Sequence, residues 1–228
     1  MILAFLFTFF LYVYLDFFFR ERLCPEAKVL PSLPRWKVGK EWTFFISPGY
    51  WVARLLKNRI SFFPPYQRMH ARRHLVWKSN IYNVYFSCFI TTLVFTLFCI
   101  WPNSVNFLTA LATIRFVSRT FEITYAFGND VVSRQQNKSG LHKQTRIRLA
   151  LKSYFELYII AIPVYFLYSD SMTFSKAVIM SMSVGSLTNV GMAISEKNDL
   201  LSIFAFSQVL ATLSLVVLSL AMYLSRKK

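Results

Sequence analysis

The chain has 228 residues, of which 55% are hydrophobic, 24 are phenylalanine and only 16% are charged. A soluble domain of this size could not bury so much apolar surface, so the composition excludes a soluble globular protein and indicates an all-α integral membrane protein. The net charge of +16 would suit nucleic-acid binding, but no nucleic-acid motif accompanies it and the basic residues flank the apolar runs. We therefore expect basic loops on the cytoplasmic side and no nucleic-acid partner.

The first apolar run, residues 2–19, is just long enough to cross a bilayer. It has no basic leader and no Ala-x-Ala cleavage site, so we expect residues 1–19 to form a transmembrane anchor rather than a cleaved signal peptide. Asp16 lies near the cytoplasmic end of this run, where its side chain can reach the interface by snorkelling.

The next segment, residues 20–80, holds about half of all lysines and arginines. Ser47-Pro48 predicts a helix start, with Ser as the cap and Pro in the first turn, and Pro64-Pro65 predicts its end. Apolar and basic side chains are interleaved along it: Trp51, Leu55 and Ile60, with Arg54, Lys57 and Arg59. We expect this helix to lie in the plane of the membrane surface, with its basic side toward anionic lipid head groups.

Metal-binding patterns are weak. The three cysteines (Cys24, Cys88 and Cys99) leave at least one thiol unpaired and form no Cys/His pattern. His70 and His74 have the i, i+4 spacing of metal ligands, but neighbouring cations disfavour a metal there. We therefore expect neither a metal site nor a cofactor.

Residues 81–127 predict two transmembrane helices, over 81–101 and 107–127, separated by Pro102-Asn103-Ser104. The second helix carries three charged residues on one face, at i, i+4 and i+7: Arg115, Arg119 and Glu122. Charges that face lipid are costly, so we expect them to be paired inside the bundle. Arg119 can pair with Glu122, and Glu156 of a later helix is the candidate partner of Arg115.

Charge parity sets the number of crossings. The basic segment 20–80, the stretch 134–148 that includes most of a polar linker at 128–145, and the tail 226–228 should all be cytoplasmic. Helices 81–101 and 107–127 supply the two crossings between the first pair of basic regions. The apolar runs 147–168 and 200–224 supply the two before the tail, so the segment between them must enter and return without crossing. We expect about five transmembrane helices plus this re-entrant segment, with the N-terminus outside and the C-terminus cytoplasmic, in a plasma or bacterial inner membrane.

The re-entrant segment has helical potential over 173–187 and continues as Ser186-Leu187-Thr188-Asn189-Val190-Gly191-Met192-Ala193. An apolar helix, a short half-buried segment ending in Thr-x-Val-Gly and a second apolar helix resemble the two-helix pore module of the potassium-channel superfamily. The resemblance covers about residues 146–225 of a pore-like region at 146–228. It implies a homotetramer that conducts a monovalent cation passively, with an irregular strand over 188–193 that points its carbonyl oxygens at the ion.

Residue by residue, Thr188, Val190 and Gly191 match the filter pattern of that family. Asn189, Met192 and Ala193 stand where the family has a threonine, an aromatic residue and a second glycine. Alanine would be strained at a position that needs positive φ. The resemblance therefore implies the pore fold and a selectivity-filter-like segment, and does not imply potassium selectivity.

The last helix carries polar residues along one face, at Gln208, Thr212, Leu215 and Ser219. This spacing predicts one of two arrangements. The face can line a wet pathway in an oligomer, or it can pack against neighbouring helices through hydrogen bonds.

Three functions compete. The leading hypothesis is a tetrameric, ion-channel-like protein for cations. The alternative is a non-conducting membrane interaction or assembly protein that uses residues 20–80 as a docking surface. A membrane-bound enzyme acting on lipid would have only His70, His74 and Asp130 as cytoplasmic catalytic candidates, with no recognisable motif, so we expect no enzyme.

Overall fold

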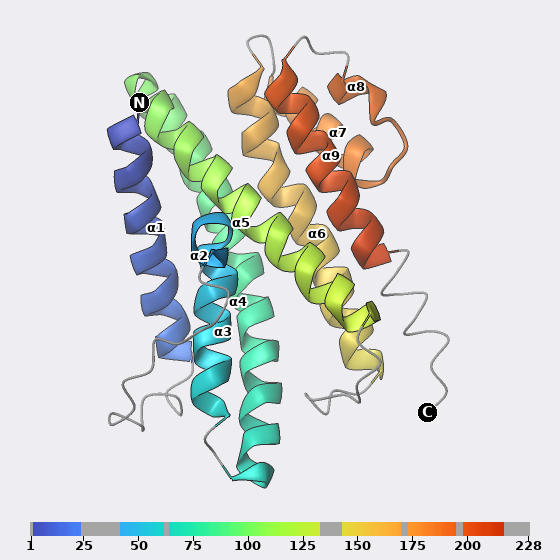
Figure 1. The fold of residues 1–228 in the computed structure, drawn as a ribbon. Helices are drawn as coiled ribbons and strands as arrows, with labels where there is room; N and C mark the ends of the chain where they lie inside the picture. Colours follow the sequence, from blue (N-terminus) through green and yellow to red (C-terminus); the bar gives the residue numbers. More distant parts are fainter. Residues whose placement is uncertain are drawn as a thin grey trace.

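The computed structural model describes residues 2–23, 42–61, 64–132, 143–169, 173–194 and 198–216, and over these ranges it contains helices and no strands. The long helices are α1 (Ile2–Leu23), α4 (Pro65–Ile100), α5 (Val105–Val132), α6 (Lys143–Tyr168) and α9 (Asp199–Leu213). The short elements are α2 (Thr43–Ile46), α3 (Pro48–Ile60), the 3-10 turn η2 (Pro102–Ser104), α7 (Phe174–Gly185) and α8 (Gly191–Ile194). Figure 1 shows the long helices in one bundle, with α3 beside one half of it and α7 and α8 beside the first half of α9.

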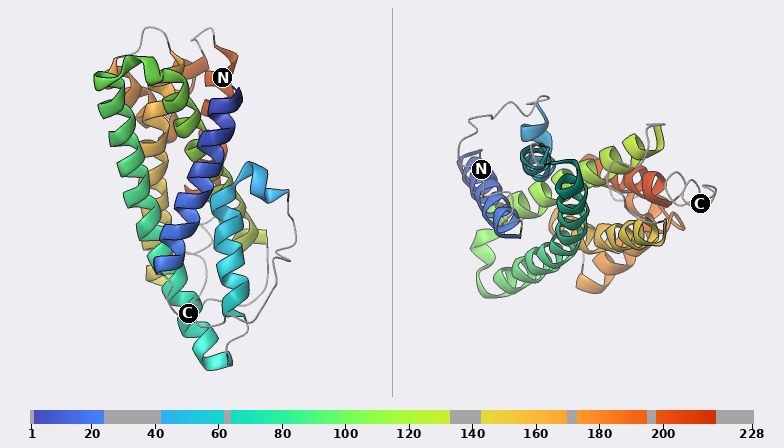
Figure 2. Two further views of the ribbon diagram at one scale, coloured as in Figure 1. Left: turned by 90° about the vertical axis from the view of Figure 1, so that its left-hand side faces the viewer. Right: turned by 90° about the horizontal axis from the view of Figure 1, so that it is seen from below.

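Three of the described helical stretches are long and apolar enough to cross a membrane: Tyr66–Ile100, Gln144–Tyr168 and Asp199–Val216. This agrees with a membrane protein built from helices. α1 and α5 run through the same bundle (Figures 1 and 2), and α1 begins at the end of the bundle opposite to that at which α9 ends. The five crossings and the orientation in the membrane remain predictions.

Local signals in the sequence place several helix ends. Pro102-Asn103-Ser104 forms a single 3-10 turn between α4 and α5. The Ser47 hydroxyl accepts a hydrogen bond from the Tyr50 amide at 3.3 Å and Pro48 occupies the first turn, as expected for the start of α3. Thr173 caps α7 in the same way, accepting from the Lys176 amide.

The packing of α3 differs from that expected of a helix lying on a membrane surface. α3 runs alongside α1 and α4 and packs against them and α5 (Figures 1 and 2). Val52, Leu56 and Ile60 are fully buried, in a cluster with Ala71 and Leu75 of α4. The buried stripe at i, i+4 and i+8 is as compatible with a bundle as with a lipid surface, and the partner helices decide between the two.

The start of α3 is anchored deep in the bundle. The Ser47 hydroxyl donates to the Ser118 carbonyl of α5 at 2.7 Å, and the Gly49 amide donates to the Ser118 hydroxyl at 3.3 Å. Burial raises the pKa of the Tyr50 hydroxyl to about 12, and its hydrogen bond with Tyr125 of α5 adds to the shift. These contacts hold α3 as part of the bundle.

α4 begins earlier than expected. Residues 65–80 form the first turns of one 36-residue helix rather than the end of a loop. At 1.5 Å per residue this helix is about 54 Å long, against about 30 Å for the hydrocarbon core of a bilayer. Figure 2 shows the start of α4 projecting beyond the other helices. The basic residues of this part are therefore carried on a rigid helical extension.

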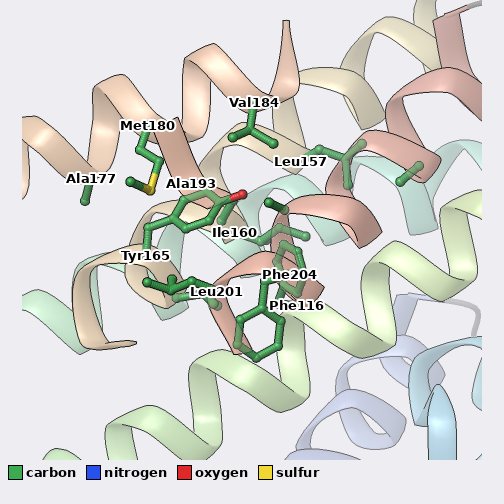
Figure 3. Packing of buried hydrophobic residues seen from close by; sticks show 14 of the residues in the cluster. Phe116, Leu157, Ile160, Tyr165, Ala177, Met180, Val184, Ala193, Leu201 and Phe204 are labelled. Atoms are coloured by element: carbon green, nitrogen blue, oxygen red, sulfur yellow. The ribbon is translucent and has the colours of Figure 1, made fainter. Parts of the chain in front are cut away.

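The largest apolar cluster joins α5, α6, α7, α8 and α9 (Figure 3). Its fully buried members include Phe116 of α5, Val164 of α6, Val184 of α7, Ala193 of α8 and Leu201 of α9. The short helices α7 and α8 are thus fixed against three long helices. Cys24, residues 133–142 of the linker, Ser219 and the tail 226–228 lie outside the described residues.

We predict that Leu56→Ala destabilises the protein by about 2–5 kcal/mol, because it opens a cavity between α3 and α4. Thermal unfolding of the purified protein in detergent would measure the loss. The matched control is Asn58→Ala on the exposed side of α3, expected to change stability by no more than about 0.5 kcal/mol. Equal melting temperatures for the two variants would contradict the packing of α3 in the bundle.

Candidate functional site

The segment between α6 and α9 begins and ends at one place. The Asn198 side-chain amide, at the start of α9, donates to the carbonyl of Tyr168, the last residue of α6, at 2.8 Å. Figure 1 shows α7 running inward from this end of the bundle and the chain returning to it through α8. The segment therefore enters the bundle and comes back on the same side.

Hydrogen bonds of Ser181 give the depth of α7. Its hydroxyl donates to the Tyr158 carbonyl at 2.7 Å, and its carbonyl accepts from the Gln208 amide at 3.1 Å. Tyr158 lies ten residues before the end of α6 and Gln208 lies nine residues after the start of α9. At 1.5 Å per residue these distances are about 15 Å along α6 and about 14 Å along α9, so Ser181 lies well inside the bundle.

α7 ends in a tight backbone cap. Leu187 has a φ of 63°, in the left-handed region, and is the only described non-glycine residue with a positive φ. The Leu187 amide donates to the Val184 carbonyl at 3.1 Å, and the Thr188 amide donates to the Ser183 carbonyl at 3.0 Å. This pair of bonds is the Schellman arrangement, which satisfies the last carbonyls of a helix and turns the chain away from its axis.

The expected irregular strand over 188–193 is wrong for its second half. Residues 191–194 form the short helix α8, and the Asn189 side-chain oxygen accepts from the Met192 amide at 3.2 Å. Ala193 is fully buried in the apolar core. Asn189 therefore acts as a helix cap and Ala193 as a core residue, with no positive φ at Ala193. The sequence pattern could not distinguish a strand from a capped turn of helix.

What remains irregular is a short polar turn at 186–190. Ser186, Leu187, Thr188 and Asn189 are all exposed on the surface of the protomer. The hydroxyls of Ser186 and Thr188 lie 2.9 Å apart, and the Thr188 hydroxyl also reaches the Ser183 carbonyl at 3.3 Å. We call residues 186–189 the exposed turn.

The polar face of α9 packs inside the protomer. Gln208, Thr212 and Leu215 are buried, and the Gln208 side chain accepts from the Tyr165 hydroxyl of α6 at 2.7 Å while donating to Ser181 of α7. These residues therefore join helices of one chain, and their expected role in lining a pathway between protomers is corrected. Ser219 lies outside the described residues.

Gly185 allows α7 to approach α6 and α9 closely. A Cβ at this position would lie 2.4 Å from a ring carbon of Tyr158 and 2.8 Å from the Gln208 amide nitrogen. The Gly185 carbonyl also accepts from the Tyr154 hydroxyl at 3.3 Å. The absence of a side chain thus lets α7 sit against the tyrosines of α6.

We predict that Gly185→Ala destabilises the protein by about 1–3 kcal/mol, because the added methyl group overlaps the Tyr158 ring. Gly128→Ala in α5 is the control: a Cβ there meets nothing within 4 Å, and alanine favours the helix by up to about 1 kcal/mol. Thermal unfolding in detergent would compare them. A Gly185→Ala protein as stable as the wild type would contradict the close approach.

The second feature is a cluster of buried charges beside this segment. Arg119 donates two hydrogen bonds of 2.7 Å to Glu156 of α6, one to each carboxylate oxygen. The third guanidinium nitrogen of Arg119 contacts Glu122 at 2.9 Å. Arg115 reaches Glu156 at 3.0 Å. The structure thus brings together the four charged residues that the sequence had suggested, although Glu156 accepts both arginines rather than one.

Uncharged groups complete the cluster around Arg115. Its guanidinium donates to the Ser87 hydroxyl (2.8 Å) and the Asn83 carbonyl (2.9 Å) of α4, and to the Tyr12 hydroxyl of α1 (3.0 Å). The Ser87 hydroxyl in turn donates to Glu156 at 2.9 Å. Four helices therefore meet at the two arginines.

The cluster continues to α1. Arg20 contacts Asp16 at 2.9 Å, the Asn83 side-chain oxygen at 2.9 Å and Glu122 at 3.4 Å. Asp16 is fully buried, so the expected snorkelling to the interface is wrong. The i, i+4 spacing of Asp16 and Arg20 is the signal that could have identified this pair. Ser87, Asn83 and Tyr12 carry no comparable signal in the sequence.

The three carboxylates (Asp16, Glu122 and Glu156) balance the three guanidinium groups (Arg20, Arg115 and Arg119). Buried charges are tolerated when they are paired and hydrogen-bonded, and removing one partner leaves an uncompensated charge. The arrangement can therefore fix the rotation and depth of four helices.

We predict that Glu156→Gln destabilises the protein by about 3–5 kcal/mol, because it leaves two buried guanidinium groups without their shared carboxylate. Lys152→Gln, on the exposed side of α6 one turn earlier, is the control and should change stability by no more than about 0.5 kcal/mol. Thermal unfolding would measure both. Similar melting temperatures for the two variants would show that the cluster does not hold the bundle.

Both histidines with the i, i+4 spacing, His70 and His74, lie on α4. His70 is exposed on α4, and no group of three His, Cys, Asp or Glu side chains able to hold a metal occurs among the described residues. The third candidate for lipid chemistry, Asp130, has a side chain outside the described part.

Comparisons of the chain with protein-family models, with curated proteins and with solved structures give no match. Function is therefore argued from the residues of this chain alone.

Proposed function

We propose that the chain is one subunit of a homotetrameric membrane pore for the passive conduction of monovalent cations, and that the exposed turn at 186–189 borders the ion path. One observation carries the proposal: an irregular, polar stretch of backbone directly follows α7, whose Ser181 bonds residues about 15 Å from the end of the bundle, and this stretch is open on the surface of the protomer.

Such a stretch cannot face lipid. Inside the hydrocarbon region, backbone groups outside regular helices are tolerated only where protein or a water-filled cavity surrounds them. Several protomers that share an axis beside the exposed turn would enclose such a cavity. Four apolar side chains of the two helices α7 and α9 are exposed in the single protomer and would meet neighbouring protomers or lipid: Met182, Ile203, Phe206 and Leu210.

Two features favour cations. α7 directs its C-terminal end toward the exposed turn, and the partial negative charge of a helix C-terminus stabilises cations nearby. The hydroxyls of Ser186 and Thr188 and the amide oxygen of Asn189 add neutral oxygen ligands. Residues 186–194 contain no charged residue. The proposed path therefore favours cations through the dipoles of α7 and of neutral side chains, and it discriminates weakly among monovalent cations.

The membrane topology is part of the proposal. α1, α4, α5, α6 and α9 would make five crossings, with the N-terminus outside and the C-terminus in the cytoplasm. The paired charges of α5 support its place in the membrane, because all three are neutralised inside the bundle.

We predict that Thr188→Val lowers cation conductance roughly 30-fold or more, because each of four subunits loses a hydroxyl contact worth about 0.5 kcal/mol or more. The purified full-length protein would be reconstituted into liposomes and potassium and sodium flux measured. Valine keeps the shape of threonine, and the side chain is exposed, so the fold should persist.

Ser104→Ala is the matched control, because the Ser104 hydroxyl also bonds a local carbonyl, that of Trp101 at 2.7 Å, but lies in the turn between α4 and α5. It should conduct as the wild type does. A correctly assembled wild-type protein without flux would contradict the pore and favour a non-conducting assembly protein. Equal flux from both variants would show that the Thr188 hydroxyl does not border the ion path.

A further inference from the structure

We propose that the basic extension of α4, together with α3, forms a binding site for the phosphate head group of an anionic phospholipid, with Arg72 and Lys57 as its principal cations. The site is distinct from the proposed ion path and does not depend on conduction. It replaces the in-plane contact expected of α3, because the structure commits the apolar face of that helix to the bundle.

The outer face of α4 marks where the membrane interface meets this helix. Tyr85 and Phe89 are 72% and 59% exposed, as lipid-facing side chains would be. Toward the start of the helix the exposed large side chains become Trp77, Met69 and Tyr66, at 46%, 52% and 78%. Tryptophan and tyrosine concentrate at the head-group level of membranes, so residues 66–77 of α4 lie at that level.

Positive charge gathers at the same level. Neither α3 nor α4 contains an acidic residue. Their basic side chains from this region are Arg54, Lys57, Arg59, Arg68, Arg72, Arg73 and Lys78. Arg59 of this set pairs with Glu21 of α1 at 3.5 Å. Each lysine or arginine near an anionic membrane surface contributes about 1 kcal/mol of favourable binding free energy.

Arg72 is the residue that gives this attraction a fixed position. It follows Ala71, a buried residue of α4 in the cluster with α3. The Nε of Arg72 is buried and has no hydrogen-bond partner among the described residues. A buried donor of this kind is costly unless a partner is supplied, and a phosphate oxygen is an acceptor that suits a guanidinium.

Lys57 of α3 belongs to the same site. Lys57 follows Leu56 and Arg72 follows Ala71, and because Leu56 and Ala71 belong to one buried cluster, the two cations lie beside the same contact between α3 and α4. Desolvation lowers the pKa of the Lys57 ammonium, and the positive charges of Arg20 and Arg72 lower it further, in agreement with this placement. Glu122 opposes this shift, but its carboxylate is already engaged by Arg119 at 2.9 Å and Arg20 at 3.4 Å. An anion between α3 and α4 would neutralise the two cations.

The test uses the purified full-length protein in a neutral detergent with an equimolar mixture of phosphatidylglycerol and phosphatidylcholine, and counts retained lipid by native mass spectrometry. We expect the wild type to retain phosphatidylglycerol preferentially. Arg72→Gln and Lys57→Gln should each weaken that preference about fivefold. Arg73→Gln removes the same charge one residue away, on the exposed side of α4, and should change it by less than twofold.

Three results would overturn the site. Equal losses for Arg72→Gln and Arg73→Gln would show diffuse attraction only. No preference in the wild type would show that the basic surface does not select anionic lipid. Displacement of the lipid by inorganic phosphate would show a soluble-anion site. Melting temperatures of the variants identify loss of folding, and Lys57→Gln tests the site from a second helix if Arg72→Gln unfolds.

Discussion

The arrangement of the described helices depends on one buried carboxylate. Glu156 accepts two bonds from Arg119, one from Arg115 and one from Ser87, and so ties α6 to α5 and α4. Because α6 turns about 100° per residue, Tyr158 and Tyr165 point to nearly the opposite side of the helix. On that side of α6, the Tyr158 backbone carbonyl accepts from Ser181 of α7 and the Tyr165 hydroxyl donates to Gln208 of α9. Fixing Glu156 on one side therefore sets where α7 and α9 lie on the other.

This constraint explains how the exposed turn is held in place. α7 is anchored by its contacts with Tyr158, Gln208 and the close approach at Gly185, and α8 is anchored by Ala193 in the apolar core. The turn between them is left at the surface, with its own amides satisfied by the Ser183 and Val184 carbonyls. A rigid frame around an open polar segment is the arrangement that a pore subunit requires, and a lipid-facing position would leave that segment unsolvated.

Some of this could be predicted from the sequence and some could not. The i, i+4, i+7 spacing of Arg115, Arg119 and Glu122 placed them on one face, Ser47 predicted a helix start, and residues 173–187 were expected to be helical. The direction of α3 could not be read, because an amphipathic stripe suits both a lipid surface and a helix neighbour. The polar face of α9 could be read from the sequence. The sequence could not show whether that face lines an ion path or packs against Tyr165 of α6. Asn189 looked like an altered filter residue and is a helix cap, since Asn serves both turns and caps.

The most direct measurement is the water accessibility of position 188 in the membrane. A variant with its native cysteines replaced and a single cysteine at Thr188 would be reconstituted into liposomes and treated with a charged, membrane-impermeant thiol reagent. The account predicts rapid modification at 188 and none at Ile203, an exposed apolar position on α9 that would face protein or lipid. Protection of position 188 in a correctly assembled protein would contradict the claim that the exposed turn borders water.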